Sequence, residues 1–351
     1  MYIIIAILIF GILITVHELG HFLAAKSVGV KVNEFSIGMG PGIFKKQGKE
    51  TLYSLRLLPI GGYCAIEGEN DDSEDERSMG KKPLIARLFI LFSGSFMNFL
   101  AGFLIVLIIV STSPYYSTTR LDGFMDGFPL QGESGLMAGD RIVSIDGHSV
   151  NLISEFSLHM DRRADEDTVD MVVIRDGKRV KLDDFPLVLR EYEVDGEKAM
   201  KYGLLFGVSE RTFFSVFQQA WYNSLYFVKM VWMGLSDIVT GRAALSQMSG
   251  VVGAVAAIGE VGASSATVID GLINVFYLGA FIAVNLAVMN LLPIPGLDGG
   301  HIFTMIVVAA ITKLTGRKPN PKVEAYIHGA GLVILLILMA VLLVSDVVKL
   351  F

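Results

Sequence analysis

Two histidines and a glutamate lie inside an apolar segment at the start of the chain, and this feature constrains the fold more than any other. The segment runs from about Tyr2 to Ala25 and contains the motif HELGH, with His17, Glu18 and His21. An apolar run of about 20 residues is long enough to cross a bilayer as a helix. Ionisable side chains are costly inside a membrane and usually mark a functional site there. The segment therefore predicts a membrane helix that carries a polar site.

Composition is consistent with several membrane spans joined to a water-exposed domain. Of the 351 residues, 52% are hydrophobic and 18% are charged. The chain is therefore too apolar for an ordinary soluble protein and too charged for a helix bundle that lies wholly within the membrane. The net charge of −6 argues against nucleic-acid binding, which needs basic residues to neutralise phosphates. The single cysteine, Cys64, allows no intrachain disulfide, and we interpret it as a buried or reduced thiol.

Further apolar segments give the number of spans. They run from about Leu88 to Ser111, from Gly271 to Leu292 and, more briefly, from Gly329 to Val344. With the first segment they predict a polytopic α-helical membrane protein with about four transmembrane helices. The stretch from Phe213 to Val239 mixes aromatic with polar side chains at helical spacing. That mixture favours a helix lying in the membrane interface, with a fifth span as the alternative.

A long polar stretch, from about Tyr115 to Arg211, separates the second and third spans. It contains GLMAGDRIVSIDG and then an amphipathic helical pattern near Leu152 to Arg163. An alternating run from Thr168 to Ile174 follows, and it ends at the dipeptide Asp176-Gly177. Asp-Gly between alternating apolar residues is a strong signal for a β-hairpin. We therefore expect a small α+β domain inserted between the two spans.

The HELGH motif has the spacing of a metal site. Residues four apart lie on one face of a helix, so both imidazoles can bind one ion, and the adjacent Glu18 can act as general base. Zinc lowers the pKa of a bound water from about 16 to about 7. The competing interpretation is a polar contact between membrane helices. Catalytic zinc usually has three protein ligands, so a third is required.

The third ligand is expected where the third span is interrupted by NLLPIPGLDGGH. Pro and Gly break the helix there, and irregular backbone at membrane depth occurs only inside protein or beside water. Asp298 is the ionisable residue best placed to bind metal, and His301 is a competitor. An aspartate that only caps a helix or forms a turn is the other possibility for Asp298.

The distribution of Lys and Arg predicts the orientation in the cell membrane. Positive residues flank the loop after the first span and the loop between the third and fourth spans, so both loops are expected to be cytoplasmic. The N-terminus, the C-terminus and the inserted domain are then extracytoplasmic, with the active site near the cytoplasmic side. HELGH and Asp298 both lie near the cytoplasmic side only if the segment from Phe213 to Val239 does not cross the membrane. The positive residues are Lys26, Lys31, Lys81, Lys82, Arg87, Lys313, Arg317, Lys318 and Lys322.

The two motifs, in this order and spacing, resemble the signatures of the site-2 proteases, a family of intramembrane zinc metalloproteases. GLMAGDRIVSIDG resembles part of a PDZ domain, and one such domain between the second and third spans is similar to the bacterial RseP-like branch. The resemblance covers nearly the whole chain. It implies Zn²⁺ bound by His17, His21 and Asp298, with Glu18 as the base. It also implies that Asn290 contacts the substrate backbone or the developing oxyanion.

The resemblance extends to the region after the first span. FSIGMGP and GGYCAIEGE are similar to a membrane-associated β-hairpin region that presents a strand edge to the unwound substrate, which implies substrate-binding roles for Gly38 and Gly40. The implied substrates are single-pass transmembrane proteins such as anti-sigma factors and signal-peptide remnants, and the implied surroundings are membrane lipid. A non-enzymatic PDZ-containing membrane receptor or scaffold is the alternative function.

These expectations give a four-part organisation. Residues 1–112 form an N-terminal membrane half with the hairpin region, and residues 115–205 form the PDZ-like domain. Residues 206–268 form amphipathic interfacial helices, and residues 269–351 form a C-terminal membrane half.

Overall fold

The computed structural model describes residues 1–69, 73–163, 166–194, 196–242, 250–317 and 319–349. It divides into two compact units, and the chain passes between them twice, each time within a helix. The first unit comprises Met1–Ile109 and Phe227–Phe351, and the second comprises Val110–Tyr226. Both HELGH and Asp298 belong to the first unit, so the candidate site lies within one compact body.

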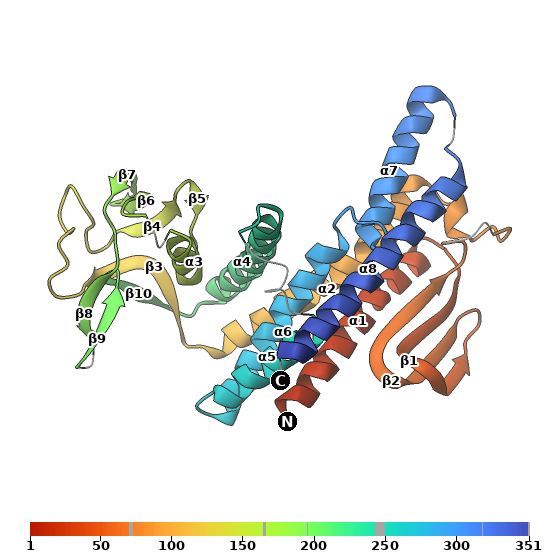
Figure 1. The fold of residues 1–351 in the computed structure, drawn as a ribbon, viewed down its shortest axis with the longest axis horizontal. Coiled ribbons are helices and arrows are strands. Elements are labelled where there is room, and N and C mark those ends of the chain that lie inside the picture. Colours follow the sequence, from red (N-terminus) through yellow and green to blue (C-terminus); the bar gives the residue numbers. More distant parts are fainter. Residues whose placement is uncertain (70–72, 164–165, 195, 243–249, 318, 350–351) are drawn as a thin grey trace. The chain divides into compact units, whose positions relative to one another are not determined.

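Within the described residues, four helices are long and apolar enough to cross a membrane. Their positions confirm the four spans predicted from the apolar runs, and the second and fourth helices extend beyond their runs at both ends. The third helix ends at Asn290, two residues before its apolar run does, so the rest of the NLLPIPGLDGGH motif follows that helix. Together they fit a multi-pass membrane protein (Figure 1). They are α1 (Tyr2–Ser27), α2 (Leu84–Thr112), α6 (Val268–Asn290) and α8 (Pro321–Lys349).

Helices α1 and α2 pack through small residues. A Cβ atom placed on Gly20 of α1 would lie 2.3 Å from the carbonyl oxygen of Ser93 in α2. Small residues allow two helix backbones to approach this closely, which is a common way for membrane helices to associate. The contact lies between His17 and His21 along α1, so it brings α2 against the face that carries both histidines.

The helix α6 stops where proline and glycine were expected to break it. It ends at Asn290, and α7 (Asp298–Thr315) begins after a seven-residue loop, 291–297. Pro293 and Pro295 lack backbone N–H groups, so the loop cannot continue the helical hydrogen bonds. Gly296 has a φ of +95°, which a residue with a side chain rarely adopts. The loop therefore turns the chain and places Asp298 at the first position of a new helix.

The segment after α1 forms an antiparallel sheet from two long strands, β1 (Val32–Gln47) and β2 (Leu52–Ile66). Both strands fold back, so Phe35 pairs with Tyr53 on one side and with Cys64 on the other. The short 3-10 helix η1 (Met79–Lys81) precedes α2.

This sheet lies against the middle of α1 (Figure 1). A Cβ atom on Gly11 would lie 2.2 Å from the carbonyl oxygen of Pro59. Because Gly11 is in an apolar helix of spanning length, β2 reaches well along that helix. The outer part of the sheet also exposes large apolar side chains, which suits contact with lipid. They are Ile37, Met39, Ile43, Phe44, Leu57 and Leu58.

The remaining helices of the first unit are α4 (Phe213–Val239), which spans the unit boundary, and α5 (Val251–Ser264). Helix α4 is not among the helices apolar enough to cross a membrane, which agrees with the expectation that it does not span. The N-terminus of α5 is held by Asp346 of α8, whose carboxylate accepts hydrogen bonds from Gly250 N at 3.1 Å and Gly253 N at 2.8 Å. This contact explains an acidic residue that is only 2% exposed in an apolar helix.

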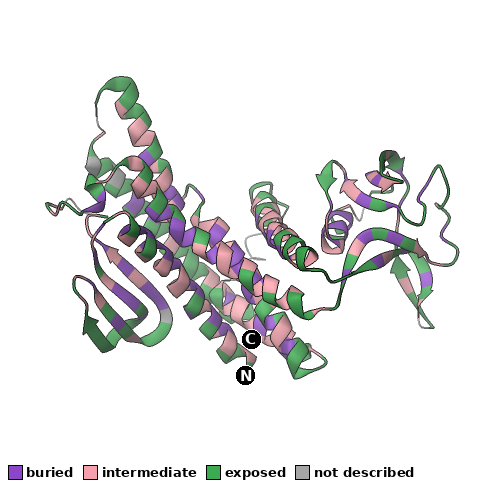
Figure 2. Cartoon of the chain, turned by 180° about the vertical axis from the view of Figure 1, so that it is seen from behind, coloured by how far each residue is buried: buried purple, intermediate pink, exposed green. Residues whose placement is uncertain are grey.

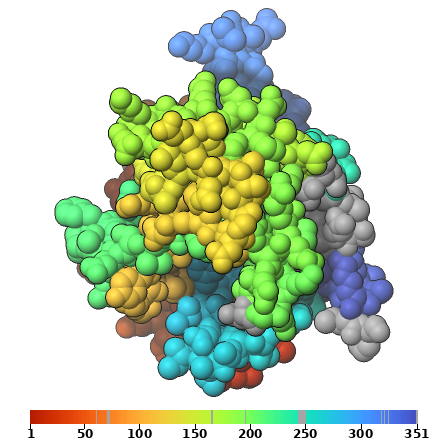
Figure 3. All heavy atoms as spheres, turned by 90° about the vertical axis from the view of Figure 1, so that its left-hand side faces the viewer, coloured from red at the N-terminus to blue at the C-terminus, as the bar shows by residue number. Residues whose placement is uncertain are grey.

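The second unit contains an antiparallel sheet and the helix α3 (Ile153–Asp161). Its strands lie in the order β10-β3-β4-β6-β7, with β5 paired to β4, and β8 and β9 form a separate hairpin. The segment between β3 and β4, drawn in yellow, covers much of the face seen in Figure 3. The strands are β3 (Tyr115–Phe124), β4 (Arg141–Ile145), β5 (His148–Ser149), β6 (Val169–Arg175), β7 (Lys178–Phe185), β8 (Arg190–Val194), β9 (Glu197–Lys201) and β10 (Leu204–Glu210).

The structure confirms the predicted hairpin in this unit. Strands β6 and β7 pair through Arg175 and Lys178, leaving Asp176 and Gly177 as the two turn residues. Their φ angles are +49° and +77°, as a two-residue hairpin turn of this kind requires. The amphipathic helix predicted near Leu152 to Arg163 is α3. The unit is therefore an α+β domain with its own buried core.

Candidate metal centre

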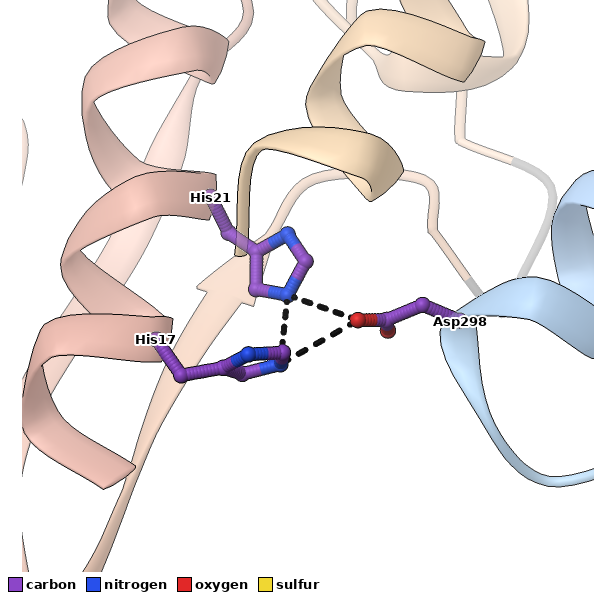
Figure 4. A group of neighbouring side chains, drawn as sticks. All are labelled: His17, His21 and Asp298. Carbon is purple, nitrogen blue, oxygen red and sulfur yellow. Dashed lines mark hydrogen bonds and ion pairs between the residues drawn. The ribbon is translucent and has the colours of Figure 1, made fainter. Parts of the chain in front are cut away.

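The side chains of His17, His21 and Asp298 converge on one point (Figure 4). His17 Nε2 lies 3.1 Å from His21 Nε2 and 3.1 Å from Asp298 Oδ2. His21 Nε2 lies 3.3 Å from the same carboxylate oxygen. Two of these residues come from α1 and the third from α7, almost 280 positions later in the chain. Within the described residues, this is the group whose ligand atoms could hold one metal ion.

The spacing of these atoms fits zinc. Zinc binds histidine nitrogen and carboxylate oxygen at about 2.0–2.2 Å, and ligand atoms of a tetrahedral site are then roughly 3.3–3.5 Å apart. The observed separations of 3.1–3.3 Å need only a slight expansion to accept the ion. Two nitrogens and one carboxylate oxygen also leave a fourth position for water, as in catalytic zinc sites.

The ring orientation of His21 is fixed by α2. Its Nδ1 lies 2.9 Å from the carbonyl oxygen of Ile90, to which it donates a hydrogen bond. With the proton on Nδ1, the lone pair of Nε2 points toward His17 and Asp298. A second hydrogen bond of this type is the usual way in which proteins orient a metal-binding histidine.

The two imidazoles also depend on the absence of a side chain at Gly94 of α2. A Cβ atom there would lie 2.4 Å from His21 Nε2 and 2.8 Å from His17 Cε1. No sequence pattern pointed to this residue, because a glycine in an apolar helix does not indicate which neighbour it faces. Contact with both histidines assigns Gly94 a place in the wall of the site.

Asn290, at the end of α6, lies at the edge of the cluster. Its Nδ2 atom is 3.5 Å from Nδ1 of His17. When Nε2 of His17 faces the metal, Nδ1 carries the proton, so an amide turned to present its oxygen would accept that hydrogen bond. The oxyanion role implied for Asn290 stays a prediction, and its nearness to His17 adds a role in orienting that ring.

Glu18 lies next to the site and is oriented by the sheet. Its carboxylate accepts a hydrogen bond from the backbone of Cys64 in β2. A Cβ atom on Gly62 would lie 3.8 Å from Glu18 Cγ, so the two backbones are close here. Strand β2 therefore positions the residue expected to be the general base. Cys64 itself is 8% exposed, which confirms the interpretation as a buried thiol.

Gly38 and Gly40 lie in the bend of β1, outside the metal cluster. Both have positive φ angles, +82° and +84°. A Cβ atom on Gly38 would lie 2.5 Å from the carbonyl oxygen of Leu58. These glycines are required for the shape of the sheet, and their substrate-binding role stays a prediction.

His301, the competing third ligand, faces elsewhere. Its ring stacks on His328 of α8, with ring centres 3.8 Å apart and planes at 2°. His328 is buried, with 9% of its surface exposed. It is held inside the protein because Gly296 and His301 both contact its ring.

An apolar pocket of about 420 Å³ lies beside the site. It is formed by α2, α4 and the end of α6, all within the first unit. Ser95, next to Gly94 in sequence, and Leu291, next to Asn290, both line it. Other residues in its wall are Phe92, Phe96, Trp232 and Val288.

The fold and the site together define a membrane metalloprotease. The sequence matches Peptidase family M50 over residues 5–338, and the chain belongs to that family. It is a zinc metalloprotease of the intramembrane type. This assignment goes against the alternative of a non-enzymatic receptor or scaffold.

Several curated relatives cover almost the whole chain. A provisionally named zinc metalloprotease of Fusobacterium nucleatum is 34% identical over 99% of this chain and 98% of its own length. Another from Clostridium acetobutylicum is 35% identical, over 99% and 97%. The regulator of sigma-W protease RasP of Bacillus subtilis is 25% identical, over 98% of each chain.

Proposed function

We propose that this protease cuts the transmembrane segments of single-pass membrane proteins, at a zinc ion held by His17, His21 and Asp298. The single observation that carries the proposal is the convergence of these three ligand atoms, next to Glu18, inside a group of helices long enough to span a membrane. A structural contact between helices would not need three metal-ligating atoms within 3.3 Å of one another.

In this proposal the residues near the metal have distinct roles. Bound zinc would polarise the scissile carbonyl and make water a nucleophile near neutral pH. Glu18 takes a proton from the attacking water and passes it to the departing amine. The backbone N–H of Cys64 keeps the Glu18 carboxylate in place for both transfers. Asn290 orients His17 and donates to the carbonyl oxygen of the substrate as negative charge develops there.

The substrate has to be extended before it is cut. In an α-helix every peptide carbonyl is hydrogen-bonded within the helix, so the nucleophile has no access to it. The part of β2 from Gly61 to Ile66 pairs with β1 and lies next to Glu18. A peptide strand added along this part of the sheet would bring a scissile bond to Glu18. The apolar pocket beside the site suits side chains that come from a membrane helix.

The proposed substrates include anti-sigma factors and remnants of signal peptides. The name of the Bacillus subtilis relative, a regulator of sigma-W protease, supports the first class. The second unit, as a PDZ-like domain on the extracytoplasmic side, would restrict entry to substrates whose outer domains have already been removed. The distribution of Lys and Arg supports this orientation, with the metal centre near the cytoplasmic side.

The test is cleavage of a model single-pass helix by purified protein carrying Glu18→Gln. Gln keeps the shape of the side chain but cannot take a proton. We expect cleavage to fall by at least a thousandfold while zinc content stays at the native level. Glu260→Gln, on an exposed position of α5, is the matched control and should leave both unchanged. Substantial cleavage by Glu18→Gln would disprove the role of Glu18.

A further inference from the structure

Helix α8 touches the loop that leads to Asp298. His328 of α8 accepts a hydrogen bond on Nδ1 from the backbone N–H of Gly296, at 3.4 Å. The same ring stacks on His301, one turn after Asp298 in α7, with ring centres 3.8 Å apart. His328 therefore contacts the chain on both sides of the expected metal ligand.

Backbone contact brings the helix and the loop close together. A Cβ atom on Gly331 of α8 would lie 2.2 Å from the carbonyl oxygen of Pro295. A Cβ atom on Gly296 would in turn lie 3.1 Å from the backbone nitrogen of Leu332. The loop thus fits against one turn of α8, from His328 to Leu332.

Among the described residues, α8 is less buried than the other spanning helices. In the most apolar 18-residue window of this helix, 11% of residues are buried, against 33% in α1, α2 and α6. Figure 2 shows how buried and exposed residues are distributed along the chain. The contact of Asp346 with α5 lies near the opposite end, about 27 Å from His328 at 1.5 Å per residue. The position of the loop relative to α8 therefore depends mainly on the turn that carries His328 and Gly331.

The chemistry of histidine suits this position. The loop contains two prolines, and Gly296 has a left-handed φ, so the N–H of Gly296 needs an acceptor from outside the loop. A neutral imidazole supplies that acceptor on Nδ1. Burial lowers the pKa of His301 to about 4, and the neighbouring His328 ring adds to this effect. The His301 ring is therefore neutral where it stacks on His328.

We propose that His328 is a positioning residue for the metal centre, which holds the 291–297 loop so that Asp298 meets His17 and His21. The inference rests on the proposed zinc ligands. His328 acts through the loop and does not touch the metal. Its hydrogen bond to Gly296 is the contact that carries the effect.

Three substitutions separate the hydrogen bond from the ring contact. His328→Phe keeps an aromatic ring for stacking but has no acceptor, whereas His328→Asn keeps an acceptor near the position of Nδ1 but has no ring. His328→Ala removes both. Tyr326→Ala, at a position that is 77% exposed on the same helix, is the control. Zinc affinity of the purified full chain is measured by competition with a chelator, and thermal unfolding of the zinc-free protein shows whether each variant is folded.

We expect His328→Phe and His328→Ala to bind zinc about 10–100-fold more weakly, as is typical when a residue supporting a metal ligand is lost. His328→Asn should stay within about threefold of the native protein, and Tyr326→Ala should match it. Native affinity in His328→Phe, or loss of affinity in His328→Asn as large as in His328→Ala, would overturn the proposal. Equal loss of folding in all three would do so too, because it would show a purely structural role.

Asp298→Ala is measured beside these variants to separate the two proposals. If Asp298→Ala loses zinc and His328→Phe keeps it, the metal site stands and the positioning role fails. If Asp298→Ala keeps zinc at native affinity, the proposed metal site itself fails.

Discussion

Gly94 of α2 lies so close to His21 of α1 that a single added methyl group would occupy the same space as the ring. A Cβ atom there would be 2.4 Å from Nε2, the nitrogen that faces the metal position. The ring cannot move away without losing the hydrogen bond from Nδ1 to Ile90. We therefore expect Gly94→Ala to reduce zinc affinity by at least tenfold and cleavage in proportion, although alanine is the better helix former. Zinc titration and a cleavage assay measure both.

Gly234→Ala in α4 is the matched control for that substitution. It makes the same change in a helix at a position where a Cβ atom meets nothing within 4 Å. It should leave zinc affinity unchanged. Native zinc affinity in Gly94→Ala would mean that α1 and α2 are not packed as described.

The carboxylate of Asp346 caps the N-terminus of α5 from a neighbouring helix. It accepts hydrogen bonds from Gly250 N and Gly253 N, two groups that have no partner within α5 itself. Asp346→Ala should lower the free energy of unfolding by about 1–2 kcal/mol, the usual cost of losing a cap. Asp346→Asn, which keeps an acceptor oxygen, should cost less. Thermal unfolding in detergent compares them, and equal stability of all three proteins would contradict the capping role.

The thiol of Cys64 is expected to be unreactive in the folded protein. Burial raises its pKa, and the nearby carboxylate of Glu18 raises it further. The thiolate is the reactive form, so at pH 8 its population is lower than for an ordinary thiol. Maleimide labelling should be at least a hundredfold slower in the folded protein than after denaturation. Ser209→Cys in a Cys64→Ala background is the exposed control, and comparable labelling rates at the two positions would refute the prediction.

The second unit can be removed without separating the ends that it joins. Strands β3 and β10 pair so that Gly123 lies opposite Leu205, and a deletion from Gly123 to Lys201 leaves Asp122 at the end of one of these segments and Tyr202 just before the other, to be joined by a short linker. We expect the shortened protein to cleave a substrate that still carries its outer domain, because the proposed restriction on entry is gone. Cleavage of a trimmed substrate should be unchanged. Continued rejection of the untrimmed substrate would count against a gating role.

Much of the first unit was predictable because membrane helices follow from simple composition. The four apolar runs matched α1, α2, α6 and α8, since about 20 apolar residues have few stable alternatives to a spanning helix. The break after Asn290 followed from its prolines and glycines. The pairing of His17 with His21 followed from helical spacing, and membrane depth pointed to Asp298. In the second unit, Asp176-Gly177 identified its hairpin.

The rest depended on tertiary contacts that sequence patterns do not encode. The role of Gly94 follows from the side of α2 that meets α1. The place of His328 depends on a loop more than 30 residues earlier, which hydropathy alone does not reveal. The double pairing of Phe35 arises because β1 and β2 both bend, and neither bend changes the alternation of side chains enough to be recognised.

The central claim is that α1 and α7 build one zinc site, and metal content tests it most directly. Native protein, His21→Ala and Asp298→Ala are purified in detergent and their zinc content is measured beside cleavage of a model helix. We predict about one zinc per native chain, with zinc and cleavage lost together in both variants. Full zinc occupancy in Asp298→Ala, or a native chain that cleaves without zinc, would contradict the account.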